Sequence, residues 1–224
     1  VTEALMDALG TDFTIATPAF PDNGRTVFKG YLFAGNVLLN ESGMQNHPLT
    51  PMTDANLVRV MQAQTRRKVG LIDYKTVAQG ESAIRQRMAD LRAEGVGVAV
   101  VDATSNEDLH RLGPALKGMP LVTAGSGVAI GLPANFGLQP SLQASQLPTA
   151  SGLQAVVSGS CSVATNAQVA HFKATGRPTW AIHPASLMHG QTDAVVQQVL
   201  VWAAPLLAQG PVLVYSTAEP EAVK

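Results

Sequence analysis

One loop of the sequence has the composition of a phosphate-binding site. A strand-like apolar run, Val156-Val157, leads into Ser158-Gly159-Ser160-Cys161-Ser162, and a segment with helical periodicity follows at Asn166–Lys173. Serine hydroxyls can donate hydrogen bonds to an anion, and the first amides of a helix carry partial positive charge. The pattern therefore predicts that Ser158, Gly159, Ser160 and Ser162 bind phosphate oxygens.

Covalent catalysis at the same loop is a weaker interpretation. A serine hydrolase needs the pattern Gly-x-Ser-x-Gly, and Gly159-Ser160-Cys161-Ser162 lacks the second glycine. Cys161 beside a helix N-terminus could form a reactive thiolate, but a small cysteine that packs in the fold is the commoner case.

A second small-residue loop follows the strand-like pair Leu121-Val122. Gly125-Ser126-Gly127 would let backbone amides approach an anion, and we count these residues as candidate substrate ligands. The loop lacks the Lys-Ser/Thr of a Walker A motif and does not fit the dinucleotide fingerprint. A glycine turn that brings a helix close to the sheet explains it equally well.

Two further loops lie in the first quarter of the chain. Asn23-Gly24 can form a tight turn, and Arg25 beyond it offers a planar guanidinium suited to a carboxylate or phosphate. The alternative is a hairpin turn with a solvated arginine. His47 lies in a proline-rich loop that leads into a helix, where Thr53 or Asp54 could serve as the N-cap and the histidine could be an ordinary loop residue.

Other polar residues follow predicted strands. His183 follows one strand of the second half, and Ser216-Thr217 follow another, so both should share an edge with the serine loop. Asp54 and Asp102 are the candidates for a catalytic base, although each could instead be a cap or a strand-end residue. Histidine and cysteine spacing does not fit a zinc site, so the expected metal is Mg²⁺ bound with a nucleotide.

Short apolar runs alternate with longer helical segments, and this alternation predicts an α/β fold of two domains with parallel or mixed sheets flanked by helices. The predicted strands are Phe13–Ala16, Val69–Ile72, Val98–Val101, Leu121–Val122, Leu153–Val157, Thr179–Ile182 and Pro211–Tyr215. The predicted helices are Thr2–Leu9, Asp54–Ala63, Ala78–Arg92, Asn106–Leu116, Asn166–Lys173 and Asp193–Ala208.

The proline-, glutamine- and serine-rich stretch from Leu132 to Ser151 predicts a domain boundary near 147–151. The domains are then residues 1–147 and 151–224, and the second has too few elements for a complete sheet. Because the chain begins at Val1 without a methionine and ends soon after an apolar run, we expect it to be a piece of a longer protein.

Composition excludes several classes of protein. The formal net charge of −1, with 15 Lys+Arg against 16 Asp+Glu, lacks the basic surface of a nucleic-acid-coating protein. No run of about 18 apolar residues is present, so a membrane is not an expected partner. The single cysteine cannot form an intramolecular disulfide, which favours a reducing cytoplasm. A homo-oligomer is compatible with the sequence, which does not fix the number of subunits.

The motifs together resemble those of the four-carbon acid sugar kinases. The serine loop with Thr165–Val169 is similar to the start of the nucleotide-binding domain of that family, and the first half is similar to its substrate domain. The motifs are most similar to those of the 3-oxo-tetronate kinases. The segments that carry the similarity to the substrate domain, in order and spacing, are Pro18–Pro21, Asn23–Thr26, Gly30–Phe33, Glu41–Met44, His47–Asp54 and Val69–Ile72.

The resemblance implies a bacterial catabolic kinase that uses ATP with Mg²⁺ to phosphorylate the terminal hydroxyl of a four-carbon acid sugar. It implies that Asn23, Arg25 and His47 face the acid sugar, and that Ser158, Gly159, Ser160, Ser162, Ser216 and Thr217 face ATP. The family also has an N-terminal Asp-Asp-Phe-Thr-Gly segment and a C-terminal Gly-Gly-x-Thr-Ser loop, and neither occurs in these residues. The alternative interpretation is a non-catalytic protein of two α/β lobes that binds a sugar acid or another anion.

Overall fold

The structure is a computed structural model that describes residues 1–47, 49–188, 190 and 192–218. The chain divides into two compact units, Val1–Leu142 (unit 1) and Gln143–Lys224 (unit 2). The division lies a few residues before the boundary predicted from composition. Both units are α/β, and the expected class of parallel and mixed sheets is confirmed.

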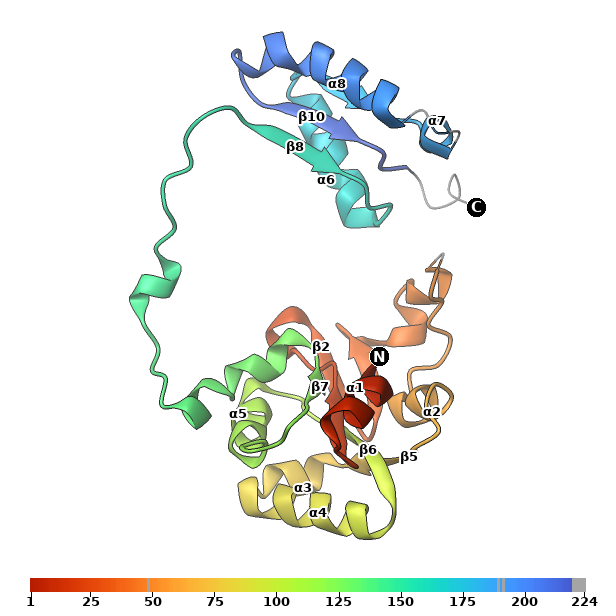
Figure 1. The fold of residues 1–224 in the computed structure, drawn as a ribbon, viewed down its shortest axis with the longest axis vertical. Coiled ribbons are helices and arrows are strands. Elements are labelled where there is room, and N and C mark those ends of the chain that lie inside the picture. Colours follow the sequence, from red (N-terminus) through yellow and green to blue (C-terminus); the bar gives the residue numbers. More distant parts are fainter. Residues whose placement is uncertain (48, 189, 191, 219–224) are drawn as a thin grey trace. The chain divides into compact units, whose positions relative to one another are not determined.

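Unit 1 is built on a parallel sheet with the strand order β5-β6-β1-β7 (Figure 1). All residues of β6 and β1 are buried, which explains why β6 reads as an unbroken non-polar run rather than as an alternating pattern, whereas β1 buries Thr14 and Thr17 as well. The register aligns Thr14 with Val98 and Ala16 with Thr123. The strands are β1 Thr14–Thr17, β5 Lys68–Ile72, β6 Val96–Val101 and β7 Thr123–Ala124.

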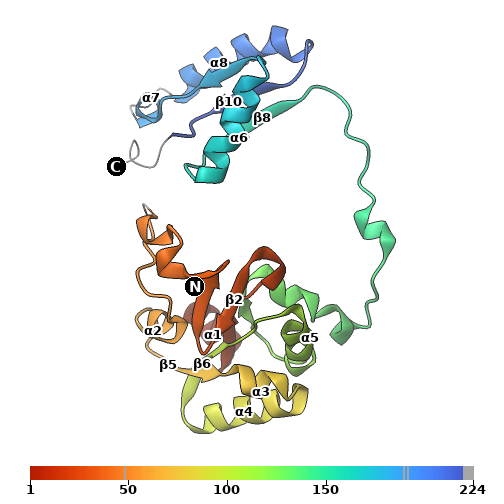
Figure 2. The same ribbon diagram turned by 180° about the vertical axis from the view of Figure 1, so that it is seen from behind.

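Helices cover this sheet, and α3, α4 and α5 pack against one another (Figures 1 and 2). The predicted start of α5 is confirmed, because the Ser105 side chain accepts from the Asp108 N–H and Asp108 bonds back to the Ser105 N–H in a capping box. The helices of unit 1 are α1 Thr2–Leu9, α2 Leu57–Gln62, α3 Tyr74–Ala78, α4 Glu81–Ala93 and α5 Asn106–Ala115.

A small antiparallel sheet joins the carboxyl edge of the parallel one, and the sequence did not predict its strands. It consists of β2 Arg25–Phe28, β3 Tyr31–Ala34 and β4 Val37–Leu38. The chain reverses between β2 and β3 at Lys29-Gly30, where both residues have positive φ angles of 52° and 77°. The hairpin weighed for Asn23-Gly24 is therefore centred elsewhere, although Asn23-Gly24 does form a turn between Phe20 and Arg25.

The strand order creates a switch point between β1 and β6. The chain leaves β1 toward β5, whereas it leaves β6 toward β7 on the other side of β1. In open α/β sheets, ligands bind outside the carboxyl ends of strands where neighbouring connections diverge. The edge beside Thr17 and Asp102 is therefore the place in unit 1 where this topology predicts a ligand.

Unit 2 has a second parallel sheet with the order β8-β10-β9, with α6 and α8 on opposite sides of it (Figures 1 and 2). Its central strand β10 is almost wholly buried, whereas the edge strand β8 is open and Val157 is 83% exposed. The elements are β8 Ala155–Ser158, α6 Val163–Ala174, β9 Thr179–Ala181, α7 Pro184–Met188, α8 Thr192–Leu207 and β10 Val212–Tyr215.

Three predicted elements were wrong in their extent. The helix predicted at Asp54–Ala63 begins only at Leu57, because Asn56 rather than Thr53 or Asp54 is its N-cap. The helix predicted at Ala78–Arg92 begins only at Glu81, because Gly80, with a φ of 88°, separates it from the short helix α3 that the prediction missed. The strand predicted at Leu121–Val122 is displaced to Thr123–Ala124. The remaining elements lie within a few residues of their predicted bounds.

Candidate functional site

The glycine loop after β7 lies directly on the loop after β1. The Gly125 N–H donates to the Thr17 carbonyl at 2.9 Å, and a Cβ at Gly127 would stand only 2.2 Å from the Ala19 carbonyl oxygen. Close backbone approach therefore explains Gly127, as the packing interpretation of this loop expects. Ser126 between the glycines is exposed and begins a 3₁₀ turn.

Arg25 and Asn23 are held beside this contact. Phe20 and Arg25 exchange two backbone hydrogen bonds of 2.8 and 3.0 Å, and the Asn23 N–H donates to the Phe20 carbonyl at 2.9 Å. Phe20 also packs against Gly127. Arg25 is half-buried as a residue, and its guanidinium forms no ion pair with any described residue. The backbone of Asn23 and Arg25 is thus held close to the Gly125-Ser126-Gly127 loop, and the Arg25 guanidinium has no acidic partner in the part of the chain that the structure describes.

His47 occupies a different place. Its Nδ1 accepts hydrogen bonds from the backbone N–H groups of Thr50 and Leu49, at 3.0 and 3.4 Å, and lies 3.0 Å from Thr50 Oγ1. A ring nitrogen that accepts from backbone N–H groups is unprotonated, so the proton of the neutral ring is on Nε2. None of these bonds reaches Arg25. The loop therefore presents a hydrogen-bond donor, in a segment separate from the Arg25 cluster.

Asp54 is an ion-pair partner of Arg59. Arg59 donates to both carboxylate oxygens at 2.8 and 2.7 Å, and the Asn56 N–H donates to Oδ1 at 2.9 Å. The hydrogen bonds from Arg59, followed by the one from Asn56, hold the pKa of Asp54 below its ordinary value. The guanidinium also lies over the Tyr31 ring, 5.7 Å from its centroid. Asp54 therefore fastens the start of α2 next to β3.

Asp102 follows β6 at the switch point and is fully buried. Its Oδ2 accepts from the backbone N–H groups of Lys29 and Tyr74 at 2.7 and 2.9 Å, and its Oδ1 accepts from the Gly30 N–H at 2.8 Å. Burial raises the pKa of Asp102, and the three N–H groups oppose that effect. Both carboxylate oxygens are already engaged, so the side chain has the geometry of a structural strand-end residue.

The carboxyl edge of unit 2 brings the loops after β8 and β10 together. Ser158 Oγ and Thr217 Oγ1 are 2.7 Å apart and share a hydrogen bond, and the Ser216 N–H donates to the Ser158 carbonyl at 2.9 Å. A Cβ at Gly159 would lie 3.5 Å from Ser216 Oγ, which is an ordinary contact. His183, exposed after β9, starts the third loop of the same edge. The sequence predicted this shared edge, and the parallel pairing produces it.

The N-terminus of α6 is prepared for an anion. Ser162 is the N-cap, and its Oγ accepts from the Thr165 N–H at 3.2 Å, while Ser160 Oγ accepts from the Ser162 N–H at 3.2 Å. The N–H groups of Val163 and Ala164 form no hydrogen bond with another described residue. Two free amides at a helix N-terminus are the donors that phosphate oxygens require.

Sequence reasoning gave no role to Asn166, although it joins the two loops. Its Nδ2 lies within 3.1 to 3.3 Å of three carbonyl oxygens, those of Cys161, Ser162 and Ala218. The amide on the first turn of α6 therefore fixes the serine loop to the segment after β10. An asparagine soon after a small-residue loop was the only available signal, and its partner Ala218 is distant in sequence.

No metal centre can be assembled from the protein residues that the structure describes, because no three His, Cys, Asp or Glu side chains converge. The donor set of unit 2 consists of hydroxyls and amides, which suit the oxygens of a nucleotide better than a bare cation. Among the described helices, none combines the length and the apolar character needed to cross a bilayer.

Both halves of the chain match models of known protein families. Residues 1–132 match the family model of a sugar-binding N-terminal domain, and residues 155–224 match that of a nucleotide-binding C-terminal domain. The chain belongs to the four-carbon acid sugar kinase family. The resemblance drawn from the sequence motifs is therefore confirmed.

Relatives in this family have established names. The chain is 54% identical to the 3-oxo-tetronate kinase of Pseudomonas fluorescens and 43% identical to that of Haemophilus influenzae, in both cases over 100% of its length. It covers 52% and 54% of those two proteins, so the chain spans about half the length of the curated relatives it matches.

Solved structures of family members share the fold. Haemophilus influenzae protein HI1011 superposes with a TM-score of 0.65 at 41% identity, covering 100% of this chain and 53% of that one. A Salmonella typhimurium protein described as a putative tRNA synthase gives a TM-score of 0.74 at 40% identity, with the same two coverages.

Proposed function

We propose that the protein is an ATP-dependent kinase that phosphorylates the terminal hydroxyl of a four-carbon acid sugar, with a 3-oxo-tetronate as substrate. The observation that carries this proposal is the 54% identity over the entire chain to a 3-oxo-tetronate kinase. The two domain matches support it, because one concerns a sugar and the other a nucleotide. The single cysteine and the use of ATP favour work in the cytoplasm.

In unit 1, the proposed ligand is the carboxylate of the acid sugar. The guanidinium of Arg25, which forms no ion pair with a described residue, can form a bidentate pair with it, and Ser126 and Asn23 lie in the loops whose backbones pack beside Phe20 and Arg25. Gly125 and Gly127 allow the two loops to meet closely enough for this arrangement. His47, with its proton on Nε2, would donate to a substrate hydroxyl.

In unit 2, the proposed ligand is the phosphate chain of ATP. The free amides of Val163 and Ala164 and the hydroxyl of Ser160 would bind its oxygens, with Ser158, Gly159 and Ser162 shaping the loop. Ser216 and Thr217 contribute hydroxyls from the neighbouring loop. Phosphoryl transfer requires mainly that the two substrates are positioned and that charge is neutralised, and these groups serve both purposes.

Mg²⁺ would arrive with the nucleotide, bound by phosphate oxygens and water, and would neutralise charge on the transferred group. Neither Asp54 nor Asp102 has a free oxygen for proton abstraction in this structure. We therefore assign both carboxylates to holding unit 1 in shape.

The test is a coupled ADP-release assay on the product of the complete gene, with ATP, Mg²⁺ and a panel of 3-oxo-tetronates, erythronate and threonate. ADP release that depends on a 3-oxo-tetronate supports the proposal. If the folded protein binds an acid sugar but neither binds nor hydrolyses ATP, the non-catalytic binding protein is the better interpretation. Release with only another acid would replace the substrate within the same reaction class.

A further inference from the structure

Asp102 is a buried carboxylate with an unusual set of hydrogen-bond donors. Its side chain is 0% exposed, yet its hydrogen bonds come from backbone N–H groups rather than from a lysine or an arginine. Burying a carboxylate is costly unless donors surround it, so this residue must organise the backbone segments that supply those donors. The nearby Lys29 ammonium instead lies over the Phe28 ring, 5.6 Å from its centroid.

Two of the donors belong to the turn of the β2–β3 hairpin. The positive φ angles of Lys29 and Gly30 place their consecutive N–H groups on the same carboxylate. The next residue, Ala103, exchanges two backbone hydrogen bonds with Val27, of 2.8 and 3.0 Å. Asp102 and Ala103 therefore attach β2 to the end of β6 at two adjacent points.

The hairpin held in this way carries Arg25. Arg25 and Val27 are two residues apart on β2, so their side chains share a face, and Val27 is fully buried. The point from which the Arg25 side chain extends thus depends on where β2 lies. The same turn also fixes the start of α2, because the Leu57 N–H donates to the Gly30 carbonyl at 2.7 Å.

We propose that Asp102 is a positioning residue that sets the affinity for the acid sugar by fixing the strand that carries Arg25, without contacting the substrate. This inference rests on the proposed function, because it takes the acid-sugar carboxylate as the ligand of Arg25. On this proposal, replacing Asp102 changes the acid-sugar KM, whereas replacing a residue that only stabilises the fold does not.

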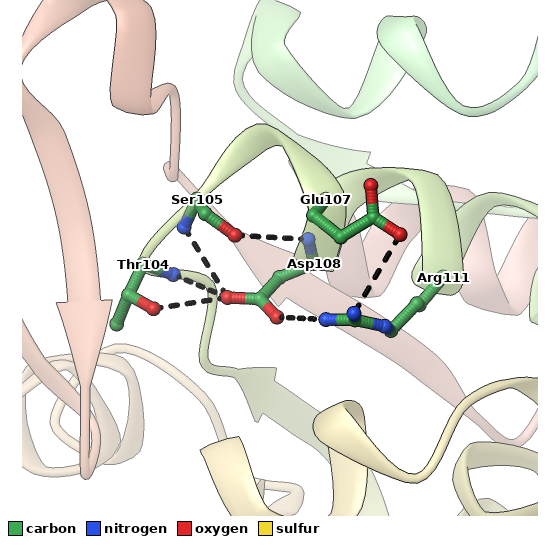
Figure 3. A network of polar contacts seen from close by, with 5 residues as sticks. All are labelled: Thr104, Ser105, Glu107, Asp108 and Arg111. Carbon is green, nitrogen blue, oxygen red and sulfur yellow. Dashed lines mark hydrogen bonds and ion pairs between the residues drawn. The ribbon is translucent and has the colours of Figure 1, made fainter.

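The chain provides a matched control in Asp108. This carboxylate is also buried in unit 1 and accepts from the N–H groups of Thr104 and Ser105 at 2.9 and 3.2 Å (Figure 3). It further bonds Thr104 Oγ1 and Arg111, and all of these partners lie within residues 104–111. Asp108 therefore organises the start of α5 and makes none of its hydrogen bonds with the hairpin.

The experiment compares Asp102→Asn with Asp108→Asn in the product of the complete gene. The KM for the acid sugar, the KM for ATP, kcat and the melting temperature are measured for each. An asparagine at 102 puts an NH₂ group against backbone donors, so the hairpin shifts, and we expect the acid-sugar KM to rise at least tenfold with the ATP KM unchanged. Asp108→Asn should lower the melting temperature and leave both KM values unchanged.

A milder pair keeps the test decisive if Asp102→Asn does not fold. Tyr74 is the first residue of α3, a position that accepts proline, so Tyr74→Pro removes one N–H donor to Asp102 and preserves the helix start. Tyr74→Ala keeps that N–H and removes only the ring, which packs 4.6 Å from Phe28. The acid-sugar KM should rise more for the proline variant than for the alanine variant.

The experiment separates failure of the proposed function from failure of the positioning role of Asp102. Wild-type protein that turns over no four-carbon acid sugar contradicts the proposed function. Wild-type protein that does turn one over, with an acid-sugar KM that Asp102→Asn leaves unchanged or that Asp108→Asn raises equally, contradicts the positioning role alone.

Discussion

The carboxyl edges of the two parallel sheets carry different kinds of polar group and differ in how closely their loops pack. In unit 1 the edge holds buried carboxylates, an attached hairpin and a glycine loop pressed onto the neighbouring backbone. In unit 2 the edge consists of hydroxyls and free amides around Ser158 and the start of α6, with room around Gly159. The first edge combines closely packed backbone with the Arg25 guanidinium, whereas the second offers several hydroxyl and amide donors.

This difference fits two kinds of anion. A small carboxylate is recognised best by one fixed guanidinium with planar geometry. A phosphate chain is longer and is bound by several amides and hydroxyls together. Substitutions should therefore have sharp, local effects in unit 1 and graded effects in unit 2.

The largest expected effect is on stability at the tight glycine loop. Gly127→Ala places a Cβ within 2.2 Å of the Ala19 carbonyl oxygen and should destabilise unit 1 by about 3 kcal/mol. Gly159→Ala is the matched change in unit 2 and should cost less than about 0.5 kcal/mol. Chemical unfolding followed by circular dichroism measures both.

Tryptophan fluorescence supplies the control for that comparison. Both tryptophans of the chain, Trp180 and Trp202, lie in unit 2 and their rings are 5.3 Å apart. Gly127→Ala should therefore shift the circular dichroism midpoint and leave the fluorescence midpoint unchanged. If alanine caused the same loss of stability at Gly127 and at Gly159, the two edges would not differ in how closely their loops pack.

The next effect is on ligand binding by Arg25. Arg25→Gln should raise the KM for the acid sugar by roughly tenfold to a hundredfold, because a charge-assisted hydrogen bond is worth about 1.5–3 kcal/mol. The KM for ATP should not change. Arg66→Gln, which alters an exposed arginine outside this cluster, is the control. An equal rise of both KM values in Arg25→Gln would argue against a separate carboxylate site in unit 1.

A smaller effect separates the two capped helices. Ser105→Ala and Ser162→Ala each remove an N-cap and should each cost about 1 kcal/mol of stability. Only Ser162→Ala should also weaken ATP binding, measured by titration calorimetry, since only α6 begins in the proposed phosphate loop. ATP binding that falls equally in both variants would show that the loss comes from reduced stability alone.

The smallest effect concerns pH, and it has opposite signs for two carboxylates of unit 1. Burial alone would raise the pKa of Asp108, but bonds from Thr104, Ser105 and Arg111 outweigh it and the pKa is lowered. Its contribution to stability is therefore present above the unfolded pKa of about 3.9 and is lost as the pH falls through the folded pKa. The pKa of Asp102 is raised, so its contribution is present at low pH and is lost as the pH rises through the folded pKa.

Urea midpoints measured between about pH 3 and pH 6 test this sign. Asp108→Asn should flatten the loss of stability in acid, and Asp102→Asn should make that loss steeper. If both substitutions changed the pH dependence of the urea midpoint in the same direction, the opposite pKa shifts of Asp102 and Asp108 would be contradicted.

The sequence predicted the parallel strands well, because a strand buried on both faces reads as an unbroken apolar run, as at Val96–Val101. It also predicted the start of α5 from the side chains of Ser105 and Asp108, which act within one turn. The β2–β3–β4 sheet was missed because its strands are short and partly exposed.

The sequence predicted which loops lie together at each sheet edge, but not the contacts between them; the ligands of these loops stay a prediction. Small polar residues after strands identified the Ser158 and Gly125 loops, since parallel strands place their ends together. The partners of Asp102 and Asn166 come from segments far away in sequence, and no local pattern encodes such pairings. His47 and Arg25 were grouped by resemblance, whereas none of the hydrogen bonds of His47 extends beyond its own loop.

The position of β1 has a consequence for how the protein is made. This strand is synthesised before β6 and β7, yet it lies between them in the sheet and pairs with both. At ordinary rates of translation it waits on the order of ten seconds for its partners. During that interval the backbone N–H and C=O groups of Thr14–Thr17 lack their strand partners, so we expect chaperones that bind extended segments to act on unit 1 before they act on unit 2.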